Sequence, residues 1–223
     1  MSEMGPMWLT VQLAGVTTAV LLVLGTPLAW WLARTRATIK PVVETVTALP
    51  LVLPPTVLGF YLLILLSPDS AIGSLWISIT GDTLTFSFAG LVVASVLYSL
   101  PFMVQPLQSA FENVGAGPLE AAASLGANPW DAFFSVTLPL CARGFLTATV
   151  LTFAHTIGEF GVVLMVGGNI PGETKVVSIA IYEHVETLRY AQAHSLSAML
   201  MAFAFAVLFV VYFVNRRFPM RVY

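Results

Sequence analysis

Charged residues and cysteines are scarce in this sequence. Only 9% of its 223 residues are charged, whereas about 25% is usual in a soluble domain. So few charges cannot cover a water-soluble globule, which argues against a soluble enzyme, a nucleic-acid binder and a disordered chain. The single cysteine, Cys141, excludes an intramolecular disulfide and a thiolate metal cluster. The chain also lacks a Gly-x-x-x-x-Gly-Lys-Ser/Thr loop, so we expect neither an ATP site nor a cofactor of its own.

The sequence contains long apolar runs that are almost free of charged residues. In total, 58% of the residues are hydrophobic. About 20 apolar residues in a helix cross the hydrocarbon core of a bilayer. A chain in lipid must satisfy its own backbone hydrogen bonds, so such runs are expected to be helical. The runs lie at about 9–33, 41–66, 86–110, 144–168 and 195–214. The sequence therefore predicts an all-α, multi-pass membrane bundle of about five helices, forming one transmembrane domain over residues 1–223.

The basic residues predict how this bundle is oriented. With five spans, seven of them fall on one side of the membrane, namely Arg34, Arg36, Lys40, Arg143, Arg216, Arg217 and Arg221. Only Lys175 and Arg189 fall on the other. Basic residues gather on the cytoplasmic side, so the N-terminus is expected outside and the C-terminus inside. The charged segment Gly172–His194 is then an external loop with a short interfacial helix.

The internal loop at 112–143 is expected to hold two short helices. Pro118 opens the first, which runs to Leu125 and ends at Gly126, a residue suited to a left-handed cap. Asn128 caps the second, which should end at about Leu138, before a proline. Three aromatic residues follow Asn128, and two interpretations remain open. Trp130, Phe133 and Phe134 either pack on the protein's own helix ends and the lipid interface, or dock into a groove of a soluble partner.

The same loop carries a family resemblance. Glu120-Ala121-Ala122, three residues, Gly126, nine residues and Val136-Thr137-Leu138-Pro139 resemble the EAA loop of ABC importer permeases, with Val136 in place of isoleucine. We therefore call residues 112–143 the EAA loop. In that family the loop is a coupling helix seated in a cleft of the ATPase subunit. The resemblance implies this coupling role for Glu120, Ala121, Ala122, Gly126, Trp130, Phe133 and Phe134.

Three further stretches resemble the molybdate importer permeases. They are Leu49–Gly59, Gly158-Glu159-Phe160-Gly161 and Asn169-Ile170-Pro171-Gly172-Glu173-Thr174. Sulfate and thiosulfate permeases share the Gly-Glu-Phe-Gly stretch, and His155-Thr156 departs from the Arg-Ser pair often found before it. The resemblance implies a type I ABC importer permease fold and import of an oxyanion, with molybdate favoured over tungstate, sulfate or thiosulfate.

The resemblance also implies partners and a location. The expected partners are two copies of an ABC ATPase, which hydrolyses the ATP, a second copy of this chain, an external oxyanion-binding protein and the lipid of the cytoplasmic (inner) membrane. No nucleic acid is expected. The chain itself is then a transport subunit and not an enzyme.

Neutral hydroxyl groups could line a pathway for a dianion that must be held weakly. The candidates are Ser95, Ser99, Thr147, Thr149, Thr152 and Thr156. The alternative is that each hydroxyl bonds a carbonyl of its own helix.

Glu159 shares a helix face with His155. Because a carboxylate repels an anion, we expect Glu159 to cap backbone amides or to pair across helices, with a gate as the alternative.

Two other classes of function are possible for a membrane chain of this kind. An ion-coupled secondary transporter usually shows internal repeats and buried charges for ion coupling, and the sequence shows neither. An intramembrane enzyme needs a convergent nucleophile and base, and none is evident. Binding of an ATPase that depends on Glu120–Gly126 would separate the importer permease from both.

Overall fold

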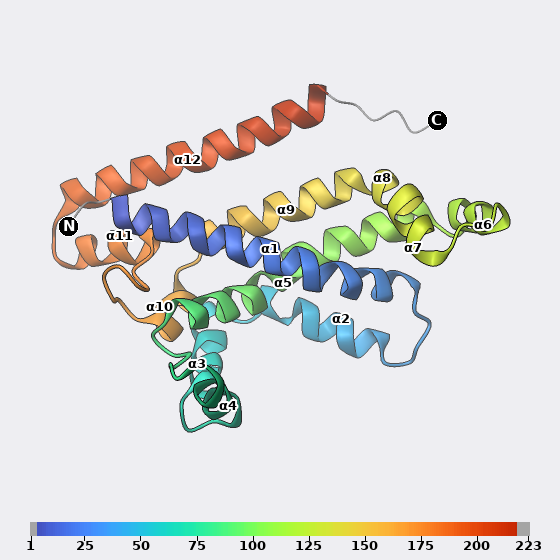
Figure 1. Ribbon diagram of the computed structural model, residues 1–223. Coiled ribbons are helices and arrows are strands. Elements are labelled where there is room, and N and C mark those ends of the chain that lie inside the picture. Colours follow the sequence, from blue (N-terminus) through green and yellow to red (C-terminus); the bar gives the residue numbers. More distant parts are fainter. Residues whose placement is uncertain (1–3, 218–223) are drawn as a thin grey trace.

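The computed structural model describes residues 4–217, and every regular element among them is a helix. Four long helices run roughly along one axis (Figure 1): α1 (Met4–Arg34), α5 (Phe88–Val114), α9 (Ala142–Ile157) and α12 (Tyr190–Arg217). By length and composition three helices can cross a membrane. The number rises to five if two bent pairs, Lys40–Leu51 with Pro55–Leu66 and Pro129–Leu140 with Ala142–Ile157, each count as one span. The expected all-α membrane bundle is confirmed. Of the basic residues used for orientation, Arg221 lies outside the described residues.

The core lies where α1, α5 and α9 pack together. Leu21, Leu32, Met103, Leu107 and Ala148 are fully buried there. The approach of α1 to α5 is close at Gly25, where an added Cβ would stand 2.9 Å from Cγ of Met103. By contrast, α12 leaves most of its apolar side chains exposed, as expected for a surface covered by lipid.

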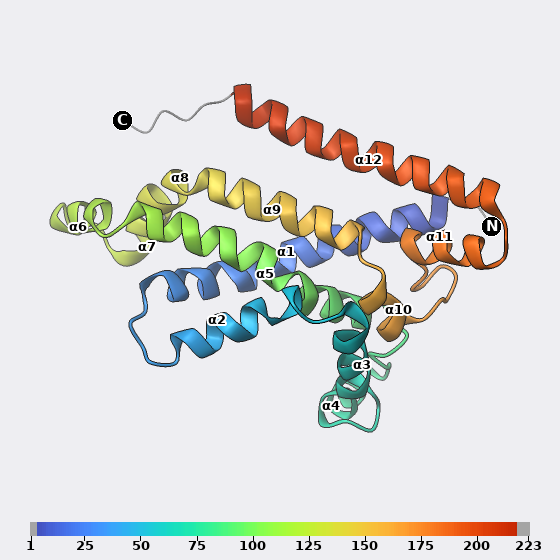
Figure 2. The same cartoon turned by 180° about the vertical axis from the view of Figure 1, so that it is seen from behind.

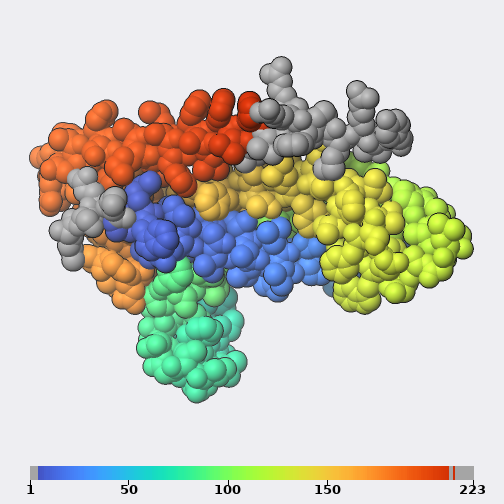
Figure 3. Space-filling view, turned by 45° about the horizontal axis from the view of Figure 1, so that its top comes forward, coloured from blue at the N-terminus to red at the C-terminus, as the bar shows by residue number. Residues whose placement is uncertain are grey.

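The expected span at 41–66 is broken into two helices. It forms α2 (Lys40–Ala48), the short helix η1 (Leu49–Leu51) and α3 (Pro55–Leu66), and the two halves are bent by 112°. Pro54 and Pro55 supply no backbone N–H, so the helix cannot continue through them. α3 and the following α4 (Ala71–Thr80) project from the bundle as an arm (Figures 1 and 3).

The expected span at 144–168 is also divided. α9 ends at Ile157, residues 158–160 are not helical, and α10 (Gly161–Gly167) follows. A long connection leads to α11 (Val177–Glu186), the short helix expected in the 172–194 loop. In both views α11 and the start of α12 lie at one end of the bundle, and the EAA loop lies at the other (Figures 1 and 2).

A polar clamp joins α2 to α5 near the EAA-loop end. Gln108 Nε2 donates to Glu44 Oε1 at 2.7 Å and to Glu112 Oε1 at 3.0 Å. Lys40 Nζ lies 3.6 Å from Glu44 Oε1 and 3.7 Å from Glu112 Oε1. The only charge in the second apolar run, Glu44, is thus paired with Lys40 at the end of the bundle.

Candidate functional site

Glu159 occupies the break between α9 and α10, and its side chain is almost fully buried. Ser95 Oγ donates to Glu159 Oε2 at 2.5 Å, and Ser99 Oγ donates to Glu159 Oε1 at 2.7 Å. Both serines lie on the buried face of α5. A buried carboxylate needs such partners because desolvation penalises its charge. The carboxylate therefore pairs across helices with α5 rather than capping the amides beside Gly158 and Gly161.

His155 extends this polar cluster. Its Nδ1 lies 2.9 Å from Ser99 Oγ and 3.5 Å from Glu159 Oε1. The single hydroxyl proton of Ser99 points to Glu159, so a proton on Nδ1 of His155 would be donated to Ser99 Oγ. The ring stacks on Phe102, with centroids 3.9 Å apart, and lies 4.7 Å from the ring of Tyr98. The imidazole is thus fixed on two sides by aromatic rings.

Backbone contacts hold the break itself. Ser178 Oγ, at the start of α11, donates to the carbonyl oxygen of Glu159 at 2.5 Å. A Cβ added to Gly161 would stand 2.8 Å from Cβ of Pro55. The missing side chain lets the first turn of α10 approach the first turn of α3. The Gly-Glu-Phe-Gly stretch thereby joins α5, α11 and α3 at one point.

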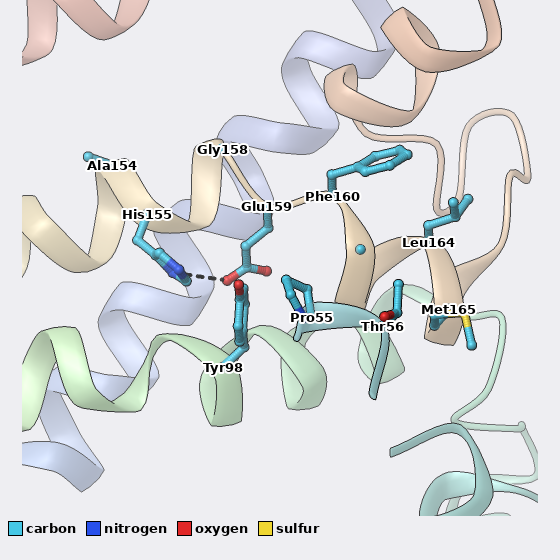
Figure 4. Close-up of a pocket in the computed structure, with 11 residues that line it drawn as sticks. Pro55, Thr56, Tyr98, Ala154, His155, Gly158, Glu159, Phe160, Leu164 and Met165 are labelled. Carbon is cyan, nitrogen blue, oxygen red and sulfur yellow. Dashed lines mark ion pairs between the residues drawn. The ribbon is translucent and has the colours of Figure 1, made fainter. Parts of the chain in front are cut away.

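An open cavity of about 530 Å³ adjoins Glu159. Its wall includes Pro55, Thr56, Tyr98, His155, Glu159, Phe160 and Met165. The side chains of His155 and Tyr98 both point toward the carboxylate of Glu159 (Figure 4). Thr56 and Tyr98 are not among the residues predicted from the sequence. Their signals were present, because Thr56 lies within the Leu49–Gly59 stretch and Tyr98 directly precedes Ser99.

The candidate threonines of α9 are not all at this cavity. Thr156 Oγ1 lies 3.0 Å from Ser99 Oγ and donates to the carbonyl oxygen of Thr152 at 2.9 Å. Thr152 is fully buried, and its hydroxyl has no partner among the described residues. Thr149 is half-buried outside the wall of the cavity, and Thr147 lines a different cavity near Arg143. Within residues 4–217, no three His, Cys, Asp or Glu side chains are placed to hold a metal ion.

The EAA loop forms a helix-turn-helix at the far end of the bundle. α6 (Gly117–Ser124) is followed by Gly126 at φ +87°, a left-handed conformation that favours glycine. The turn is closed by a hydrogen bond from the Ala127 N–H to the carbonyl oxygen of Ala122 at 3.0 Å. Asn128 Oδ1 then accepts the N–H of Asp131 at 2.9 Å, which caps α7 (Pro129–Ala132). Glu120 and Ala121 are exposed, whereas Ala122 is buried.

The second helix continues further than expected. Its end was expected at about Leu138, but a π-helical turn, η2 (Phe133–Thr137), is followed by α8 (Leu138–Leu140). The wide π turn shifts the hydrogen-bond register ahead of Pro139. The missing N–H of Pro139 then falls in the first turn of the new segment, where it interrupts no bond.

The three aromatic residues of this loop divide between two roles. Trp130 is 75% exposed and Phe134 is 57% exposed, and their rings stack with centroids 6.4 Å apart. Phe133 instead points inward, edge to face against Trp30 of α1 at 5.1 Å. It also lies 6.3 Å from Phe111 of α5. The interpretation as internal packing fits Phe133. Trp130 and Phe134 instead expose their apolar side chains, and Leu125 at the end of α6 is 90% exposed.

The chain matches one protein family and is similar to known permease proteins. Residues 25–222 match the family described as binding-protein-dependent transport system inner membrane component. The chain is 60% identical over 210 residues to the molybdenum transport system permease protein ModB of Azotobacter vinelandii, covering 94% of this chain and 92% of the relative. It is 32% identical over 200 residues to the sulfate transport system permease protein CysT of Escherichia coli, covering 90% and 72%.

Solved structures show the same fold at low sequence identity. A chain of the MetNI methionine ABC transporter, in an inward-facing conformation, superposes with a TM-score of 0.74 at 18% identity, over 97% of this chain and 99% of that one. A chain of a bacterial alginate ABC transporter superposes with a TM-score of 0.78 at 18% identity, over 97% and 80%. These likenesses confirm the fold expected from the EAA loop.

Proposed function

The chain belongs to the family of binding-protein-dependent transport system inner membrane components, and on that premise we propose that it is the permease subunit of an ATP-driven molybdate importer. The observation that supports molybdate as the substrate is the 60% identity to a molybdenum permease over almost the whole chain. The sulfate permease relatives are markedly less similar, at 32–33% identity. Molybdate, a tetrahedral dianion, is therefore favoured over sulfate.

The energy comes from a separate ATPase that docks on the EAA loop. The exposed side chains of Leu125, Trp130 and Phe134 support this contact. Large aromatic side chains at the centre of an interface commonly carry much of its binding energy. Glu120 and Ala121 are exposed on the neighbouring helix. We assign these five residues to the contact with the ATPase.

Phe133 transmits movement of the EAA loop into the membrane. Its ring packs against Trp30 and Phe111, and Phe111 also meets Phe145 of α9 edge to face at 5.8 Å. Three membrane helices thus contact one aromatic cluster at the base of the loop. Packed aromatic rings resist compression, so a shift of the docked ATPase would tilt α1, α5 and α9 together.

The cavity beside Glu159 supports a homodimer with the pathway between its two copies. This cavity is open, and its wall includes the ionisable side chains of His155 and Glu159. Such groups are costly against lipid and normally face protein or a water-filled pathway. A second copy of the chain on this face would cover the cavity and continue its wall across the two-fold axis.

The chemistry of this wall suits brief contact with an anion. Thr56 and Tyr98 offer neutral hydroxyl donors. The carboxylate of Glu159 is occupied by two serine hydroxyls, and it would repel a dianion that lingered. Weak binding allows exit, which a transport pathway requires. We therefore give Glu159 the role of fixing the broken helix rather than of a ligand.

Reconstitution tests this function. The permease is placed in liposomes with its cognate ATPase and binding protein, and uptake of radiolabelled molybdate is followed with and without ATP. We expect uptake only with ATP and the ATPase, and little competition from a hundredfold excess of sulfate. Equal competition by sulfate would make the chain a sulfate permease. Uptake driven by an ion gradient without any ATPase would make it a secondary transporter.

A further inference from the structure

A second cavity lies at the end of the bundle opposite the EAA loop. It measures about 720 Å³ and lies between the start of α1, the 169–176 connection, α11 and the start of α12. Its polar wall consists of Lys175, Glu183, His184, Arg189 and Gln192. It is separate from the cavity at Glu159, because the two have no lining residue in common.

The one acidic group of this wall is already satisfied. The ammonium of Lys175 donates to Glu183 Oε2, and Asn169 Nδ2 donates to the same oxygen at 2.6 Å. These bonds hold the pKa of the Glu183 carboxyl below its usual value. Glu183 is therefore neutralised by Lys175, and the positive charge of Arg189 remains. Among the described residues, the guanidinium of Arg189 has no ion pair or hydrogen bond.

His184 also lines this cavity. Its Nδ1 is buried, and it has no hydrogen-bond partner within the described part of the chain. A buried polar atom without a partner is destabilising, so this end of the cavity has a polar group that is not satisfied within the described residues.

The turn between α11 and α12 positions Arg189 in the wall of the cavity. Leu188 has φ +59°, a left-handed conformation that is rare for a residue with a side chain. The turn is closed by the Arg189 N–H, which donates to the carbonyl oxygen of His184 at 2.7 Å. Strain of this kind often persists where a functional group must be positioned.

We propose that this cavity binds a tetrahedral oxyanion of the phosphate class, held by Arg189, His184 and Gln192. An arginine fork matches two oxygens of such an anion. The amide of Gln192 and a ring N–H of His184 supply further donors. Tyr182, Leu188 and Tyr190 are exposed around the same turn, and aromatic residues at the head of a membrane span suit the lipid headgroup region. The oxyanion can therefore be a phospholipid headgroup or a free anion.

The experiment uses the purified permease–ATPase complex in nanodiscs, with two arms. In the first, nanodiscs contain only phosphatidylcholine, and equilibrium dialysis measures binding of radiolabelled inorganic phosphate and molybdate. In the second, native mass spectrometry measures how much phosphatidylglycerol the complex retains after transfer from mixed lipid. Each arm compares the wild type with Arg189→Gln and with Arg36→Gln, which removes the same charge from an exposed site at the EAA-loop end.

We expect Arg189→Gln to weaken binding at least tenfold in one arm and Arg36→Gln to change neither. A loss in the dialysis arm identifies a free anion, and a loss in the lipid arm identifies a headgroup. If Arg189→Gln folds poorly, Gln192→Leu provides the same comparison. Wild-type binding in both arms for both variants overturns the proposal. Both arms measure binding without ATP, so the result does not depend on whether the chain imports molybdate.

Discussion

Phe133 of the EAA loop meets Trp30 of the first membrane helix edge to face, with ring centroids 5.1 Å apart and planes at 88°. On the other side of the same loop, Trp130 and Phe134 are open to solvent. Neighbouring aromatic residues thus differ in their contacts. Phe133 joins the loop to the bundle, whereas Trp130 and Phe134 are exposed and can contact a partner. The first predictions separate these two kinds of contact.

Phe133→Ala should uncouple the importer. Removing a packed phenylalanine costs about 3 kcal/mol or more, which would loosen the contact of the loop with α1 and α5. We expect the ATPase to copurify at wild-type levels and to hydrolyse ATP, while molybdate uptake per ATP falls severalfold. The ratio of uptake to hydrolysis in proteoliposomes measures this. An unchanged ratio would show that Phe133 does not transmit movement of the EAA loop to the membrane helices.

Trp130→Ala and Phe134→Ala should instead weaken binding of the ATPase. Truncation of an interface aromatic commonly costs about 2 kcal/mol, or roughly thirtyfold in Kd. Because both side chains are exposed, the thermal stability of the isolated permease should not change. Surface plasmon resonance with the ATPase gives the affinity. Wild-type affinity in both variants would show that this surface faces something else.

Gly126→Ala should destabilise the turn of the EAA loop. Gly126 has φ +87° and open space around its Cα, so the cost is the left-handed backbone, about 1–2 kcal/mol. Gly126→Pro should abolish ATP-driven uptake because proline cannot adopt this φ. Gly117→Ala is the matched control, since Gly117 lies in α6 with open space around it and does not have a left-handed backbone. Uptake rates of the three variants, at equal membrane insertion, test the turn.

Ser95→Ala should destabilise the bundle, because it removes a donor to the buried carboxylate of Glu159. A hydrogen bond to a charged group contributes about 1.5–3 kcal/mol. We expect a lower midpoint of thermal unfolding in detergent, whereas Ser197→Ala on the exposed face of α12 should leave it unchanged. The double variant with Glu159→Gln should lose less than the sum of the single losses. Strict additivity would mean that Ser95 and Glu159 do not interact.

Acid should weaken the connection between α10 and α11. The pKa of Glu183 is lowered, first by the hydrogen bond from Lys175 and then by that from Asn169. A carboxyl with a depressed folded-state pKa stabilises the fold above its unfolded pKa of about 4.3. That stabilisation is lost as the pH falls through the lower folded value. Glu183→Gln should flatten the pH dependence of thermal unfolding in this acidic range, and Glu173→Gln, an exposed carboxyl in the same connection, should not. Parallel curves for wild type and Glu183→Gln would contradict this role.

The amino-acid sequence by itself determined the membrane class, the helical fold and the EAA loop. Long apolar runs without charge must cross lipid as helices, because a helix satisfies its own backbone hydrogen bonds there. The Asn128 cap and the left-handed Gly126 were predictable because both depend on residues within a few positions. The motifs were also sufficient for the family, which the comparison confirmed.

Only the tertiary structure decided which side of a helix faces inward and where a span breaks. Nothing near Phe133 in the chain distinguishes it from Phe134, because its direction depends on Trp30 and Phe111. Ser95 and Glu159 are 64 positions apart, so their bond follows from the packing of α5 against the α9–α10 break. The approach of Gly161 to Pro55 likewise joins two broken spans. Local patterns encode helices and caps, whereas contacts between distant segments arise only when the helices pack.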